Sequence, residues 1–180
     1  LQALAFQLLG GVDSVPPARV LRLVQRLGAA AGTPGMVGGQ YLDIAAERDG
    51  GPDTAAGRLA QIETIQRGKT GALIEWSCLA GPILGAAPEA PFQTYAAAIG
   101  LAFQIRDDLL DVEGTAEETG KAVGKDADAG KATFVDLLGA EGARAKAEAL
   151  VAEAVAALAP FDGRADFLRD LARFIVTRRS

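Results

Sequence analysis

The sequence of 180 residues contains no histidine, and this absence excludes several kinds of catalytic site. It excludes a Ser-His-Asp triad, an HExxH zinc site and a His-Asp phosphohydrolase site. There is one cysteine, Cys78, so no disulfide can form within the chain. A chain without disulfides fits a reducing compartment, and we expect a cytoplasmic protein. Because a catalytic thiol usually needs a histidine partner, Cys78 is interpreted as a core residue.

Aromatic residues are also scarce at 6%, whereas 49% of the residues are hydrophobic, mainly alanine and leucine. This composition favours helices, and the chain is long enough to bury a substantial core. The net charge of −5 argues against a general nucleic-acid-binding surface. The most apolar stretch, residues 72–87, is interrupted by Glu75, Gly81 and Pro82, so we expect no membrane span.

Helical periodicity runs through most of the chain and predicts an all-α bundle. One helix is expected to start at Pro16-Pro17 and to end at Gly32. The other expected helices cover residues 1–10, 35–47, 54–66, 72–84, 92–112, 143–158 and 166–177. Residues 68–71 are expected to interrupt the helix between 54–66 and 72–84. Residues 115–131 are predicted to form a loop, whose unusual length indicates a functional role.

Three carboxylates, Asp107, Asp108 and Asp111, lie close together in an apolar segment. In a helix, Asp107 and Asp111 are one turn apart on the same face, and Asp108 flanks them. Like charges in apolar surroundings repel one another, so such a cluster normally needs a cation. All the donors are oxygens, which indicates a hard divalent ion such as Mg²⁺. The alternative is a solvated acidic face, which the apolar character of the surrounding helix argues against.

Residues 103–111, FQIRDDLLD, resemble the second aspartate-rich motif, FQxxDDxxD, of the trans-isoprenyl diphosphate synthases, or polyprenyl synthetases. Three further segments resemble family elements in the same order along the chain. They are Gly39-Gln40 with Asp43 and Glu47 (GQxxDxxxE), Lys69-Thr70-Gly71-Ala72-Leu73 (KTGxL), and a lysine loop with Lys121, Lys125 and Lys131. A DDxxD motif alone is weak evidence for this family, whereas the ordered set of four segments is specific to it. The detail is most similar to bacterial farnesyl and geranyl diphosphate synthases.

The resemblance implies an all-α, antiparallel helical bundle of the isoprenoid synthase type. The family's first aspartate-rich motif and the arginine-rich segment after it have no counterpart here. Residues 1–180 are therefore interpreted as the C-terminal part of a single isoprenyl diphosphate synthase domain, incomplete at the N-terminus. A homodimer is expected from the family alone.

The activity that the resemblance implies is Mg²⁺-dependent prenyl transfer. An allylic diphosphate is condensed with isopentenyl diphosphate to give a short-chain isoprenyl diphosphate of the farnesyl or geranyl type. The alternative is a non-catalytic helical fragment, or a partner subunit that keeps the fold without the chemistry. For the isolated chain we expect weak Mg²⁺ binding and negligible turnover, because the first aspartate-rich motif is missing.

The resemblance also assigns roles to individual residues. Asp107 is the principal metal ligand, and Asp108 and Asp111 bind the metal directly or through water. The residues expected to bind the substrate diphosphate are Lys69, Thr70, Gln104, Lys121 and Lys131. Phe103 and Gln40 are expected to border the substrate cavity, and no protein nucleophile is required. The alternative for Lys69 is an ordinary cation at a helix C-terminus. The alternative for the loop lysines is a solvated surface.

Overall fold

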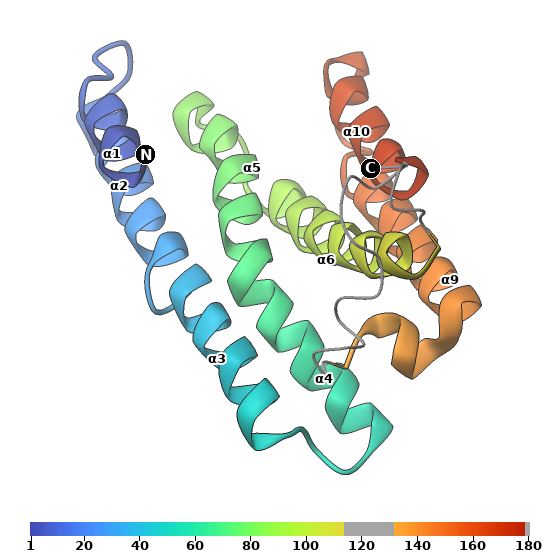
Figure 1. Cartoon of the computed structure of the whole chain (residues 1–180). Helices are drawn as coiled ribbons and strands as arrows, with labels where there is room; N and C mark the ends of the chain where they lie inside the picture. The colour runs from blue at the N-terminus through green and yellow to red at the C-terminus, as the bar shows by residue number, and fades with distance from the viewer. Residues whose placement is uncertain (114–131, 179–180) are drawn as a thin grey trace.

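The computed structural model describes residues 1–113 and 132–178, which form a bundle of helices without any strand (Figure 1). The helices are α1 (Gln2–Gly10), α2 (Pro17–Ala31), α3 (Met36–Asp49), α4 (Ala55–Gln66), the π-helical turn η1 (Arg67–Gly71), α5 (Ala72–Gly85), α6 (Ala90–Glu113), α9 (Phe134–Ala157), the 3₁₀ turn η2 (Gly163–Ala165) and α10 (Asp166–Thr177). The predicted all-α fold is confirmed. None of the helices in this described part combines the length and apolarity that crossing a bilayer requires.

Local sequence determines several helix ends. The Thr54 hydroxyl accepts a hydrogen bond from the Gly57 amide at 3.1 Å and caps α4, close to the predicted helix start at residue 54. Pro17 occupies the first turn of α2, where its missing N–H is not needed. Thr133 and Asp136 form a reciprocal capping box that starts α9.

The predicted start of α9 at residue 143 is wrong, because the helix begins earlier, at Phe134. Gly139 lies within this early part, with a φ of 70°, and bends the helix there. A glycine at positive φ weakens the helical pattern in the sequence, whereas the capping box restores the helix on its N-terminal side.

The predicted interruption at residues 68–71 is a π-helical turn and not a break. The backbone of η1 stays helical and connects α4 directly to α5. Isolated π-helical turns are rare and frequently occur at functional sites. Lys69 and Thr70 both lie in this turn.

Helix α6 lies between the α4–α5 pair on one side and α9 and α10 on the other (Figure 1). Helices α2 and α3 follow one another along one side of the bundle, and α4 and α5 return beside them in the opposite direction. Helix α6 packs against α5, α9 and α10, and α3 packs against η1. Side chains of α6 run through both large core clusters, including the fully buried Tyr95, Ala102 and Ile105. The C-terminal half of this central helix carries the three aspartates.

Cys78 packs against the larger of these core clusters. Burial, together with the charge of Glu75, raises the pKa of its thiol to about 11. The thiol is therefore protonated at neutral pH and is a weak nucleophile, in agreement with the interpretation of Cys78 as a core residue.

Candidate functional site

Asp108 is the buried member of the aspartate segment, which we define as Asp107, Asp108 and Asp111 at the end of α6. One oxygen of Asp108 accepts a hydrogen bond from the Gln104 amide at 3.0 Å. The other oxygen accepts one from the backbone N–H of Phe134 at 2.9 Å. Because Phe134 is the first residue of α9, Asp108 ties the end of α6 to the start of that helix.

Asp107 and Asp111 lie one turn apart and are both partly exposed, with 43% of the Asp107 side chain accessible to solvent. Among residues 1–113 and 132–178, no group of three or more acidic, cysteine or histidine side chains is arranged to hold a metal ion. Two accessible carboxylates nevertheless fit Mg²⁺, because this ion commonly takes one or two protein carboxylates and completes its shell with phosphate oxygens and water.

Arg178, the residue that follows α10, lies on the aspartate segment. Its guanidinium forms an ion pair with Asp107. The same guanidinium lies over the ring of Phe103, with the central carbon 4.3 Å from the ring centroid. The carbonyl of Arg178 accepts hydrogen bonds from Arg106 Nε at 3.1 Å and Nη2 at 2.7 Å. The C-terminal end of α10 is therefore fixed to the face of α6 that carries Asp107.

The ammonium of Lys69 is held by Asp43 of α3, with Lys69 Nζ donating to Asp43 Oδ2 at 2.6 Å. The Asp43 side chain is 4% exposed and that of Lys69 is 32% exposed. The backbones of α3 and η1 are in direct contact, since a Cβ atom on Gly39 would lie 2.1 Å from the amide nitrogen of Lys69. Asp43 follows Gly39 by one turn and so lies on the same face of α3. This close contact brings the carboxylate within reach of the ammonium.

Thr70, the neighbour of Lys69 in η1, points toward the end of α4. Its hydroxyl donates a hydrogen bond to Gln66 Oε1 at 3.4 Å. Gln66 is buried, so the amide holds the hydroxyl on the inner side of the turn.

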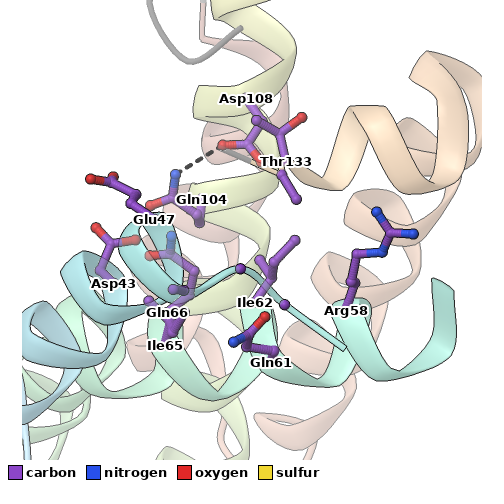
Figure 2. A pocket seen from close by; sticks show the side chains of 14 residues that line it. Asp43, Glu47, Arg58, Gln61, Ile62, Ile65, Gln66, Gln104, Asp108 and Thr133 are labelled. Carbon is purple, nitrogen blue, oxygen red and sulfur yellow. Dashed lines mark hydrogen bonds between the residues drawn. The ribbon is translucent and has the colours of Figure 1, made fainter. Parts of the chain in front are cut away.

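A cavity of about 200 Å³ lies between α3, α4, α6 and the start of α9. Its polar wall includes Asp43 and Glu47 from α3, Gln66 from α4, and Gln104 and Asp108 from α6. Figure 2 shows these side chains converging from three helices, with Gln104 bonded to Asp108. The GQxxDxxxE segment and the aspartate segment, about 60 residues apart in the sequence, thus border one space.

The structure places the remaining predicted site residues as follows. Phe103 is half-buried beneath Arg178, and Gln40 is exposed on α3. Neither lines the cavity of Figure 2. Lys121, Lys131 and the predicted loop at residues 115–131 lie outside the described residues.

Sequence reasoning gave no role to Asp43 or Gln66, although the structure places both at the cavity. Asp43 carried a usable signal, because it lies one turn after a glycine that marks a close helix contact. Gln66 carried a weaker one, as a polar residue one turn before Thr70.

Comparison with known proteins identifies the family. The family model described as polyprenyl synthetase matches residues 1–160. Geranylgeranyl pyrophosphate synthase 9, chloroplastic, of Arabidopsis thaliana is 42% identical over 186 residues, which cover 100% of this chain and 51% of that protein. The farnesyl diphosphate synthase of Haemophilus influenzae is 40% identical over 187 residues, with 100% and 60% covered.

Solved structures agree with these relatives. An FPP/GFPP synthase from Zymomonas mobilis is 44% identical, with a TM-score of 0.82 over 97% of this chain and 57% of that one. A geranyltransferase from Helicobacter pylori, solved in complex with magnesium and isoprenyl diphosphate, is 27% identical, with a TM-score of 0.76 over 97% and 56%. The chain spans about half to three fifths of the length of these proteins. It belongs to the polyprenyl synthetase family.

Proposed function

We propose that the protein carrying this chain is a Mg²⁺-dependent prenyltransferase. It condenses an allylic diphosphate with isopentenyl diphosphate and releases a short-chain isoprenyl diphosphate of the farnesyl or geranyl type. The observation that carries the proposal is the meeting of the family segments: α3 and α6 bring Asp43, Gln104 and Asp108 to one cavity, and Asp43 binds Lys69 of η1. The names of the relatives, farnesyl and geranylgeranyl synthases, support the same reaction class.

On the diphosphate side, Lys69 supplies a fixed positive charge. An ammonium group acts on phosphate as a compact point charge, and the ion pair with Asp43 orients it in advance. Thr70 of η1 and Gln104 of α6 would add hydrogen-bond donors by turning from Gln66 and Asp108 toward the diphosphate. Donors that are oriented before substrate arrives stabilise the charge that develops on a departing diphosphate. Lys121 and Lys131, outside the described residues, belong to the same proposal.

On the metal side, Asp107 and Asp111 would hold Mg²⁺ from the accessible face of α6. When bound, the ion would neutralise negative charge on the diphosphate. Asp108 stays within the proposed ligand set, while its bonds to Phe134 and Gln104 fix the end of α6. Phe103 would border the substrates from beneath Arg178.

Gln40, on the exposed side of α3, is likewise proposed to border the substrates. No protein nucleophile is needed. The homodimer, the cytoplasmic location and the assignment of residues 1–180 to the C-terminal part of a single synthase domain stay predictions.

The test is a condensation assay with the complete protein, an allylic diphosphate and isopentenyl diphosphate. Asp107→Ala is expected to lower kcat by about 10²–10³-fold, the usual effect of losing an electrostatic stabiliser. Asp170→Ala is the matched control, because Asp170 lies on the exposed side of α10 and pairs only with Arg173 in the described residues. A loss below about tenfold in Asp107→Ala would contradict the metal role. Absence of product from the complete wild-type protein would favour the non-catalytic alternative.

A further inference from the structure

The C-terminal end of α10 places a cation on a residue that the proposed function assigns to a metal. The Arg178 side chain is 13% exposed, and its guanidinium is enclosed by Asp107 on one side and the ring of Phe103 on another. Arg178 lies beyond residues 1–160, the part of the chain that the family model matches. Its contacts come from the packing of α10 on α6, which the Arg106 hydrogen bonds to the Arg178 carbonyl reinforce.

Asp107 has one negative charge to share between two cations. A guanidinium and a divalent ion on the same carboxylate repel each other, and the repulsion is strong where the surroundings exclude water. Binding of either cation therefore weakens binding of the other, and the effect is equal in both directions. We propose that Arg178 and Mg²⁺ compete for Asp107, so that Arg178 neutralises this carboxylate until the metal displaces it. The inference rests on the proposed function, because it takes Asp107 as a metal ligand.

The displacement needs only the side chain of Arg178 to move. The backbone N–H of Arg178 donates to the Phe174 carbonyl at 2.9 Å, which continues the helical pattern of α10. The Arg178 carbonyl is held by Arg106 at the same time. Rotation about the arginine side-chain bonds releases the guanidinium from Asp107 while the backbone stays in place. The exchange is therefore compatible with an unchanged bundle.

The experiment measures Mn²⁺ affinity of the full chain by electron paramagnetic resonance, without substrate, so that turnover plays no part. Arg178→Gln is expected to bind Mn²⁺ about twofold to fivefold more tightly, the range for releasing a partly exposed ion pair. Arg173→Gln is the matched control, because it removes the same charge from the same helix where the arginine pairs with Asp170. This control is expected to change the affinity by less than about 1.5-fold.

A double-mutant cycle separates competition from a general change in charge. In an Asp107→Asn background, Arg178→Gln is expected to give no gain in affinity, since the shared carboxylate is gone. An equal gain in both backgrounds would overturn the proposal. So would an unchanged or weaker affinity in a folded Arg178→Gln protein. If that variant does not fold, Arg178→Lys replaces it, with a smaller gain expected because the forked guanidinium is lost. Affinity at or below wild type in Arg178→Lys would then overturn the proposal.

The same measurements separate this inference from the proposed function. If Asp107→Asn leaves Mn²⁺ affinity unchanged, the metal role of Asp107 fails, and the competition fails with it. If Asp107→Asn weakens binding but Arg178→Gln does not strengthen it, the metal role stands and only the competition is wrong.

Discussion

Two ion pairs, Asp43 with Lys69 and Asp107 with Arg178, join the same two kinds of group in very different surroundings. The Asp43 side chain is 4% exposed and lies where the backbones of α3 and η1 touch. The Asp107 side chain is 43% exposed and meets Arg178, at the C-terminal end of α10. A buried carboxylate cannot exchange its partner for water, whereas a half-exposed one can. The first pair therefore suits a permanently oriented cation, and the second suits an exchangeable one.

The largest expected effect tests whether backbone contact fixes the first pair. Gly39→Ala would place a Cβ atom 2.1 Å from the Lys69 nitrogen and 2.6 Å from the Gly68 carbonyl carbon. Because both are backbone atoms, α3 and η1 must separate, and we expect the free energy of unfolding to fall by about 3 kcal/mol or more. Urea unfolding followed by circular dichroism measures this loss.

Gly81→Ala provides the control for this first prediction. Gly81 lies in α5, and nothing lies within 4 Å of the Cβ atom that it would gain. Alanine favours a helix over glycine by up to about 1 kcal/mol, so this variant is expected to be unchanged or more stable. Equal stability of the two variants would show that α3 and η1 do not touch as described.

The second prediction concerns the charge on Lys69. Lys69→Met removes an ammonium from a carboxylate that is 4% exposed. Breaking a fully buried ion pair lowers the free energy of unfolding by about 3–5 kcal/mol. We expect a loss of about 2–3 kcal/mol for Lys69→Met, because Lys69 itself is 32% exposed. Lys146→Met is the matched control, since Lys146 is 30% exposed but its partner Glu63 is 23% exposed. The Lys146→Met substitution should lower the free energy of unfolding by about 0.5 kcal/mol. Similar losses in the two variants would remove the distinction between fixed and exchangeable pairs.

The third prediction compares a buried and a partly exposed carboxylate within the aspartate segment, Asp108 and Asp111. Asp108→Asn keeps the shape of the side chain but weakens the bonds to the Phe134 N–H and to Gln104. We expect a loss of about 1–2 kcal/mol, because a buried donor is left poorly satisfied. Asp111→Asn makes the same chemical change at a partly exposed position on the same helix, and should alter stability by less than about 0.5 kcal/mol. The opposite order of the two losses would mean that Asp108 does not hold α9.

The sequence predicted those features that depend on near neighbours. Helical spacing placed Asp107 and Asp111 on one face, and Thr54 marked the start of α4, as the structure confirms. The π-helical turn was missed, because Gly68 and Gly71 resemble a break when the contact with α3 is unknown. Glycine weakens a helix locally, but the contact between helices decides whether the helical path continues.

The different partners of the three aspartates could not be predicted from the sequence either. Asp108 differs from Asp107 because the N–H of Phe134, 26 residues away, reaches it. Asp107 in turn meets Arg178, 71 residues away, only through the packing of α10 on α6. Periodicity assigns a residue to a face of its helix, but it does not identify what covers that face.

The smallest expected effect on stability comes from removing the ion pair between Asp107 and Arg178. Arg178→Gln removes the ion pair with Asp107 and the contact with the Phe103 ring. Each is worth about 0.5–1 kcal/mol at partly exposed sites, and we expect a total near 1 kcal/mol in urea unfolding. Glutamine can still hydrogen-bond to Asp107, which keeps the loss small.

The salt dependence of the stability loss distinguishes the two ion pairs more sharply than the size of that loss. At about 1 M salt the screening length falls to about 3 Å, which weakens an exposed pair far more than a buried one. The cost of Arg178→Gln should therefore fall by about half between 0.05 M and 1 M NaCl, whereas the cost of Lys69→Met should keep most of its value. If both costs fall in the same proportion, solvent screens the two carboxylates equally. Asp43 would then be as exchangeable as Asp107, and its pairing would no longer explain a permanently oriented Lys69.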